Sequence, residues 1–405
     1  MGVATCASST CHGATQAFRD SNVNQNELSV WQNEDPHANA YKILLDPASE
    51  AIASKLGIGP AHEADMCLDC HADNVPESAR GEKFTITEGV GCEACHGGAE
   101  NYLSSHATGS ATHAENLEAG LYPTEDPSQR AELCLSCHQG NKNQMITHRI
   151  MGAGHPRLQF ELDNFTWMHP HFEVDEDYVE RKGPYDGAVN WGVGQGVAAI
   201  TQLETLLDDQ AGWNGIFPEL VLFDCHACHR SMFKTQWVPR PSTGLGPGVV
   251  RYNDASLLMV RHVAAHVDAA AAEAIAQQTR DLHGAMRKGR AETEQAARRL
   301  LESVSAMVPR LEDTEFDSSA IRAMFEGLVK DGARGEFRDY AAAEQAALAV
   351  DTVLIAFEDN GVISAEEGER LRQEASALYD ATRSEDDYRQ SEFVAALKKL
   401  SAAVP

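Results

Sequence analysis

Five short motifs that share the same three reactive residues constrain this chain of 405 residues more than any other feature. Each motif holds two cysteines, and a histidine directly follows the second cysteine. Two residues separate the cysteines in four of the motifs, whereas four residues separate them in the first. The motifs contain all 10 cysteines of the chain. The motif residues are Cys6, Cys11 and His12; Cys67, Cys70 and His71; Cys92, Cys95 and His96; Cys134, Cys137 and His138; and Cys225, Cys228 and His229.

This pattern is the attachment signature of haem c. The two thiols form thioethers with the porphyrin vinyl groups, and the adjacent imidazole becomes the proximal ligand of the iron. Zinc ribbons use paired cysteines but need no histidine after each second one, and redox motifs occur singly. Structural disulfides more often join cysteines that lie farther apart. The sequence therefore predicts five covalently bound haem c groups, with the ten cysteines as attachment points and the five motif histidines as proximal ligands.

Twelve histidines remain when the five motif histidines are subtracted from the total of 17. A second imidazole saturates a haem iron and favours low-spin electron transfer, whereas an iron without one is a candidate catalytic centre. Four histidines have favourable positions for this distal role. One follows a proline at a predicted helix start, one comes ten residues after a motif histidine, and two flank a glycine-bearing turn at 151–154. These four candidates are His37, His106, His148 and His155.

The fifth distal ligand stays open between two places in the sequence. His62 precedes the second motif by five residues. His169 and His171 bracket Pro170 in a stretch that is rich in aromatic residues. We retain His62 and His171 as candidates for this role.

Three other histidines are weaker candidates. His226 lies inside the fifth motif and is sterically awkward as a ligand of the same haem. His262 and His266 are four residues apart, so they share one face of a predicted helix. This spacing can bind a metal, but by itself it more often indicates an ordinary packed or solvated face.

The composition changes sharply along the chain. Residues 1–240 carry the motifs together with many glycines and prolines, which predicts a pentahaem domain with little regular structure around stacked haems. Residues 241–253 are predicted to be a Pro/Gly linker. Residues 254–405 contain repeated amphipathic segments and no cysteine, which predicts a helical bundle. The predicted fold class is therefore mainly α.

Helix periodicity and breaking residues give the expected elements in more detail. Residues 192–196 are predicted to form a loop because three of the five are glycines, and 197–207 a helix. We expect a helix boundary at Pro309. The amphipathic segments lie at about 254–267, 291–307, 318–331, 336–358, 365–383 and 387–400.

The chain is strongly acidic, with 61 acidic and 33 basic residues and a formal net charge of −28. This charge argues against binding to nucleic acid or to an anionic membrane surface. No apolar run approaches the roughly 20 residues that a transmembrane helix needs. The acidity fits either a solubility adaptation or a basic redox partner. Since haem c is attached outside the cytoplasm, we expect a periplasmic or extracellular protein whose signal peptide has been removed.

Several segments resemble multihaem c-type cytochromes related to the tetrahaem cytochrome of nitrifying bacteria and to hydroxylamine oxidoreductase. The resemblance covers about 1–235, and it implies alternating stacked and perpendicular haem pairs that form one electron conduit. This chain differs by its four-residue first spacer, its five motifs rather than four, and its helical C-terminal part. The matching segments are Gly89–Gly97 followed by His106, His37–Tyr41, Thr147–Arg149 and Gly154–Leu158.

These observations favour an electron-transfer protein over an enzyme. The main hypothesis is a pentahaem cytochrome whose haems are mostly ligated by two histidines, and which carries electrons between a redox donor and a redox acceptor protein. A first alternative is an oxidoreductase of small nitrogen or sulfur compounds with one open haem. A second is a subunit of a homo-oligomer or haem-wire filament, because the first motif begins at residue 6 and its haem would lie near an interface.

Overall fold

The protein is described by a computed structural model that covers residues 1–405 except 19–23, 230–239, 247–248 and 405. The described residues are mostly helical, and their one sheet is a short antiparallel hairpin of β1 (Trp213–Asn214) and β2 (Phe217–Pro218). This confirms the predicted mainly α fold class. The chain divides into two compact units, which are described separately below.

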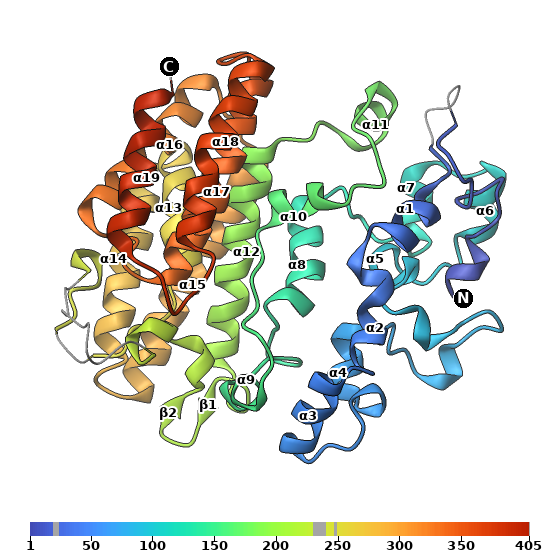
Figure 1. The fold of residues 1–405 in the computed structure, drawn as a ribbon, viewed down its shortest axis with the longest axis horizontal. Coiled ribbons are helices and arrows are strands. Elements are labelled where there is room, and N and C mark those ends of the chain that lie inside the picture. Colours follow the sequence, from blue (N-terminus) through green and yellow to red (C-terminus); the bar gives the residue numbers. More distant parts are fainter. Residues whose placement is uncertain (19–23, 230–239, 247–248, 405) are drawn as a thin grey trace. The chain divides into compact units, whose positions relative to one another are not determined.

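The N-terminal unit comprises residues 1–140, 148–159 and 165–185. It contains the first four cysteine–histidine motifs, and its helices are short. One of its apolar clusters holds only a few side chains, among them Tyr41, Leu44 and Leu68. Its helices are α1 (Glu27–Asn33), α2 (Ala40–Ile43), α3 (Pro47–Leu56), α4 (Asp65–His71), α5 (Cys92–His96), α6 (Leu103–Thr108), α7 (His113–Glu118), α8 (Pro127–His138), α9 (His148–Ala153) and α11 (Glu176–Lys182), and α10 (Leu162–Met168) begins outside it (Figure 1).

Three of the motifs lie at the C-terminal ends of short helices. Helices α4, α5 and α8 each end at a motif histidine. Helix α8 starts with Pro127 at its first position, and the carboxylate of Asp126 accepts a hydrogen bond from the backbone N–H of Gln129, 2.9 Å away. Because residues three and four apart share a helix face, these turns bring the cysteines and the histidine of one motif together.

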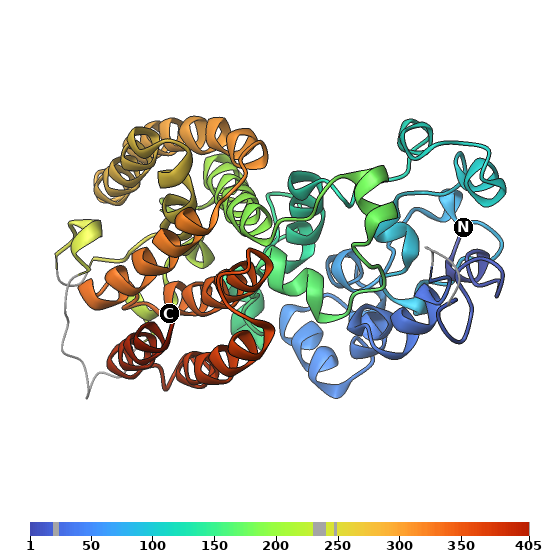
Figure 2. The ribbon, with the colours of Figure 1, turned by 90° about the horizontal axis from the view of Figure 1, so that it is seen from above.

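The C-terminal unit comprises residues 141–147, 160–164 and 186–405. It is a bundle of long helices, in which α12 packs against α13, α15 and α17 (Figure 2). The described residues within 186–253 therefore cluster with the helices that follow them. The helices are α12 (Gly187–Leu207), α13 (Ala255–Val267), α14 (Ala269–Ala285), α15 (Arg290–Glu312), α16 (Ser318–Arg334), α17 (Tyr340–Asp359), α18 (Ala365–Ala381) and α19 (Gln390–Ala403).

The bundle agrees with the amphipathic segments, with two differences. The segment 269–285 forms helix α14, which periodicity did not predict. The predicted boundary at Pro309 is wrong, because α15 continues through it to Glu312. Met307 and Leu311 on either side of this proline are fully buried, so packing holds the last turn in helical form.

The predicted loop at 192–196 is also wrong. These residues lie in the middle of α12 and are buried. Gly192 and Gly196 allow neighbouring side chains to approach closely: a Cβ atom would lie 2.8 Å from Cγ1 of Val263 at Gly192, and 2.6 Å from Cγ2 of Val308 at Gly196. Contacts with α13 and α15 therefore override the low helix propensity of glycine.

Helix α17 is long and apolar enough to cross a membrane by length and composition alone, with a mean hydropathy of 1.3. Of its apolar window, 83% is buried inside the structure. No other helix in the described part of the chain passes this test. Glu344 and Asp351 interrupt the apolar residues of this segment, so the sequence shows no continuous apolar run there.

We expect Gly196→Ala to destabilise the protein. Alanine favours an isolated helix by about 1 kcal/mol, but overpacking against Val308 costs about 1–3 kcal/mol, so the net loss should be about 1 kcal/mol. Thermal unfolding followed by far-UV circular dichroism should show a lower Tm. Gly284→Ala in α14 is the matched control, since no atom lies within 4 Å of its added Cβ, and its Tm should rise. An equal rise in the Tm of both variants would contradict the packing role of Gly196.

Candidate functional site

The N-terminal unit places each of its four motif histidines opposite a second histidine. The two rings of each pair lie at nearly the same separation, although they come from distant parts of the sequence. The ring centroids are 6.0 Å apart for His12 and His106, 5.8 Å for His138 and His37, 6.5 Å for His71 and His155, and 6.2 Å for His96 and His171.

This separation suits a metal between the rings. A metal ion held about 2 Å from one nitrogen of each imidazole separates the ring centroids by roughly 6 Å. The rings of His12 and His106 are nearly parallel, with an interplanar angle of 3°, whereas the other pairs cross at 73° to 88°. The residues present therefore fit haem irons with two axial imidazoles.

Carboxylates orient two of these rings. Nδ1 of His12 lies 3.0 Å from the Glu27 carboxylate, and Nδ1 of His37 lies 2.9 Å from that of Asp35. Asp35 also accepts a hydrogen bond from the backbone N–H of His37, so it caps the turn Pro36–Asn39 as well. This confirms the predicted helical turn at His37.

Backbone carbonyls orient two further rings. Nδ1 of His71 donates to the carbonyl of Ala40 at 3.1 Å, and Nδ1 of His155 donates to that of Pro156 at 2.8 Å. In all four oriented rings Nδ1 is therefore already used, which leaves Nε2 as the nitrogen that could bind a metal. The sequence analysis missed these orienting partners, although Asp35 stands only two residues before His37.

Several histidines outside the pairs use Nε2 instead. Nε2 of His113 lies 2.6 Å from the Glu125 carboxylate, and Nε2 of His283 lies 3.0 Å from that of Asp254. Nε2 of His262 lies 3.1 Å from the carboxylate of Asp331, so this member of the predicted i, i+4 pair is used in packing. The two groups of histidines therefore differ in the nitrogen that the protein occupies.

Burial keeps most of the paired rings neutral, which is the form that binds iron. It lowers the pKa of both His96 and His138 to about 4. Hydrogen bonds have the opposite effect at His12 and His37, where Glu27 and Asp35 raise the pKa of the imidazole. Burial also lowers the pKa of His71, His106 and His171.

A glycine brings the third motif close to His37. Gly89 has a φ of +77°, and a Cβ atom there would lie 2.5 Å from the carbonyl oxygen of His37. The same carbonyl accepts a hydrogen bond from the N–H of Val90 at 3.1 Å. The indole of Trp31 in turn donates to the carbonyl of Val90 at 3.0 Å. Only glycine fits this close approach of two backbones.

None of the ten cysteines forms a disulfide in the structure, and thiols of different motifs lie together. The thiol of Cys6 is hydrogen-bonded to that of Cys92, which lowers the pKa of Cys6 to about 7. A hydrogen bond with Cys137 raises the pKa of the Cys70 thiol. The first motif thus adjoins the third, and the second adjoins the fourth.

Two of the candidate distal residues have a different environment. His62 lies beside carboxylates, 3.4 Å from that of Glu50 and 3.7 Å from that of Glu63. His148 is the first residue of α9, a short helix that is followed by His155. The structure therefore brings His37, His106, His155 and His171 to motif histidines, while ligation by His62 and His148 stays a prediction.

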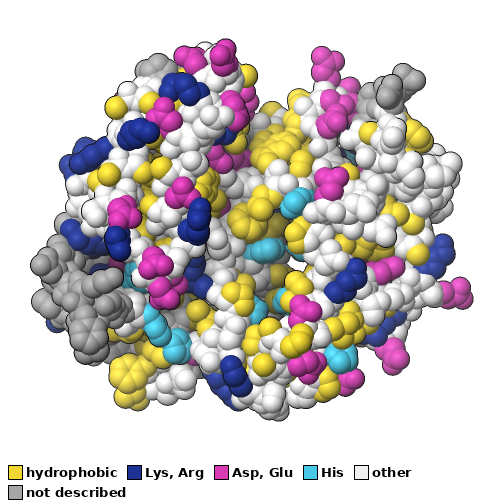
Figure 3. Space-filling model, viewed as in Figure 1, with side chains coloured by type: hydrophobic (Ala, Val, Ile, Leu, Met, Phe, Trp, Pro, Cys, Tyr) yellow, Lys and Arg dark blue, Asp and Glu magenta, His cyan; other side chains and the backbone are white. Residues whose placement is uncertain are grey.

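The fifth motif lies in the C-terminal unit. Cys225–Ala227 forms a single 3-10 turn, and the carboxylate of Asp224 accepts a hydrogen bond from the backbone N–H of His226 at 3.2 Å. Cys228 and His229 are exposed. Figure 3 shows histidine side chains at the surface beside hydrophobic ones on the face that it presents.

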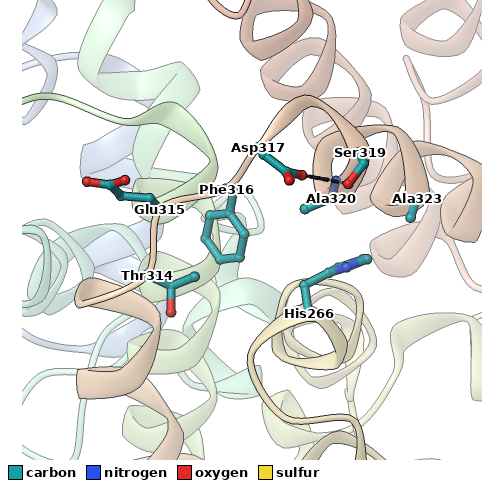
Figure 4. Close-up of a pocket in the computed structure, with 8 residues that line it drawn as sticks. All are labelled: His266, Thr314, Glu315, Phe316, Asp317, Ser319, Ala320 and Ala323. Atoms are coloured by element: carbon teal, nitrogen blue, oxygen red, sulfur yellow. Dashed lines mark hydrogen bonds between the residues drawn. The ribbon is translucent and has the colours of Figure 1, made fainter.

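The residues that line a pocket in the C-terminal unit include no cysteine. It is lined by His266 and by residues of the turn that enters α16 (Figure 4). The carboxylate of Asp317 points to the start of this helix, where it accepts hydrogen bonds from Ser319 Oγ at 2.7 Å and from the N–H of Ala320 at 2.8 Å. The acidic group of the pocket is therefore used in helix capping.

Comparison with protein families supports the interpretation of the motifs. The family model of cytochrome c554 and c-prime matches residues 5–97, which contain the first three motifs. No curated protein and no solved structure matches the chain. The match supports a c-type cytochrome, that is, a protein with covalently bound haem that functions in electron transfer.

We expect Glu27→Gln to raise the reduction potential of the haem bound at the first motif. The carboxylate increases the electron donation of the His12 ring, which stabilises ferric iron. Its loss should raise the ratio of reduced to oxidised haem about tenfold, or about 59 mV. Spectroelectrochemical titration measures this shift. Glu125→Gln, which alters the carboxylate at Nε2 of His113, is the matched control and should leave the potential of the haem at the first motif in place.

Proposed function

We propose that the protein is an extracytoplasmic pentahaem c-type cytochrome that carries electrons between two redox proteins. Four haems would be held in the N-terminal unit and the fifth at Cys225–His229. The observation that carries the proposal is the set of four imidazole pairs with centroid separations from 5.8 to 6.5 Å. The family match over residues 5–97 supports the covalent attachment.

Each bound haem accepts and releases one electron. The protein's own residues would provide two imidazoles for each of four irons, which would leave no position there for a substrate. Glu27 and Asp35 hold two of these rings in place through Nδ1, and backbone carbonyls hold two more. This arrangement favours electron transfer over catalysis at the four sites.

The neighbouring motifs suggest the order of the haems along the conduit. Cys6 contacts Cys92, and Cys70 contacts Cys137. Cys134 also lies near Cys95, which links the third and fourth motifs. We therefore propose the spatial order first, third, fourth and second motif. The short spacing of consecutive motifs supports electron hopping along this order.

Charge and attachment chemistry support the proposed location and partners. Haem c is attached outside the cytoplasm, so we propose a periplasmic or extracellular location. The net charge of −28 disfavours nucleic acid and favours redox partners with a basic docking face. Reduction by such a partner should therefore slow as the ionic strength rises.

We expect the purified protein to carry five haems, and we expect His106→Ala to open one of them. The iron at the first motif should become high-spin and bind carbon monoxide, because the ring opposite His12 is removed. Intact mass and the pyridine haemochrome count the haems, and optical and electron paramagnetic resonance spectra report the spin state. His113→Ala is the control and should stay low-spin. Fewer than five haems, or an unchanged spectrum of His106→Ala, would contradict the proposal.

A further inference from the structure

The segment that leads into the fifth motif is paired with another segment of the C-terminal unit. Phe223 and Tyr252 form an antiparallel bridge. The N–H of Asp224 donates to the carbonyl of Arg251 at 2.8 Å, and the N–H of Asn253 donates to that of Leu222 at 2.9 Å. The backbone immediately before Cys225 is therefore fixed by strand-like hydrogen bonds.

Buried ion pairs strengthen this attachment. The Arg251 guanidinium lies 2.6 Å from the Asp224 carboxylate and also contacts Asp339, the residue that precedes α17. Asp339 forms a second ion pair with Arg240, whose Nη1 lies 3.0 Å from the Asp339 carboxylate. Arg240, Asp224 and Asp339 are only 2%, 5% and 4% exposed. We call this set, Asp224, Arg240, Arg251 and Asp339, the buried ionic network.

Further acidic groups surround the network. Arg240 also contacts the carboxylate of Asp254, and its Nε lies 3.7 Å from that of Glu336. Four carboxylates therefore share two guanidinium groups in a largely buried region. Charges buried in this way interact more strongly than charges at the surface.

His226 makes a second, separate contact between the fifth motif and the bundle. Its ring centroid lies 6.0 Å from that of Tyr340 in α17 and 6.0 Å from that of Tyr388. Its Nε2 donates to the carbonyl of Glu385 at 2.8 Å. The His226 side chain, which lies between the two motif cysteines in the sequence, therefore points into the bundle and is hydrogen-bonded there.

We propose that the C-terminal unit positions the fifth haem and sets its reduction potential. Arg251 and His226 are positioning residues that fix the segment 224–228, and the carboxylate of Asp339 disfavours the addition of an electron to the haem attached there. The inference rests on the proposed function, namely that the fifth motif carries a haem. It gives the helical bundle a role in electron transfer.

Electrostatics gives the expected direction of the effect. Reduction adds one negative charge to the haem, so an ionised carboxylate nearby lowers its reduction potential. Burial and the neighbouring Asp224 raise the pKa of Asp339 to about 7, while Arg240 and Arg251 act in the opposite direction. The other charged or titratable groups that face it are Asp254 and Tyr388. The potential should therefore fall as the pH rises through 7, because Asp339 then loses its proton.

Asp339→Asn tests this role in the full-length protein with all its haems. The titration curve should contain five one-electron components, and the reduction potential of one of them should rise by about 59 mV. This shift corresponds to a tenfold increase in the ratio of reduced to oxidised haem at a given potential. The same component should lose its pH dependence around neutrality. Spectroelectrochemical titration below and above pH 7 measures both. The matched control is Asp331→Asn, which removes a carboxylate of similar burial that pairs with Arg261 in the same unit.

His226→Ala tests the positioning contact independently. We expect the haem count to stay at five, while the electron paramagnetic resonance signal of one haem broadens as its attachment segment gains freedom. His226→Phe should partly restore the signal, because it keeps a ring between the two tyrosines. His266→Ala, at the pocket of the same unit, should leave the signal unchanged.

The outcomes separate the inference from the proposed function. A wild-type protein with fewer than five haems would overturn the proposed function itself. Five haems with no selective shift in Asp339→Asn would overturn the role of this carboxylate. An equal shift in Asp331→Asn would also overturn it, because the effect would then reflect general loosening of the bundle.

Discussion

The N-terminal unit repeats one arrangement, two imidazole rings held at a separation that fits a metal between them. Four ring pairs meet it within a narrow range of 5.8 to 6.5 Å, and each pair joins distant parts of the chain. Short helices that end at motif histidines, and tight turns such as the one at Gly89, serve this purpose. A unit built in this way needs only small apolar clusters, because the porphyrins of a c-type cytochrome supply much of its interior.

The two nitrogens of the oriented imidazoles have different roles. Nδ1 is held by the protein in the oriented pairs, by Glu27 and Asp35 in two rings and by backbone carbonyls in two others. The carboxylates raise the pKa of their rings, whereas burial lowers the pKa of His96 and His138 to about 4. Chemically identical imidazoles thus differ in their environment, and such differences would change their electron donation to a bound iron.

The C-terminal unit is stabilised by different interactions. Long helices pack through close contacts at Gly192 and Gly196, and the buried ionic network ties α17 to the segment before Cys225. Burying charges is costly unless each one is paired, so such a network fixes one arrangement of the groups that it joins. The segment that leads into the fifth motif is therefore attached to the bundle.

The sequence by itself determined the chemistry, because each haem motif is local and its cysteines and histidine lie within a few residues of one another. It also determined most helices of the bundle through amphipathic periodicity, but it missed α14 and the continuation of α12 through its glycines, where packing overrides propensity. Only the tertiary structure decided which distal histidine faces which motif, since His12 meets His106 and His71 meets His155 through contacts that no local pattern encodes. The orienting groups at Nδ1 and the ionic network behind the fifth motif were likewise decided by residues that become neighbours only when the chain has folded.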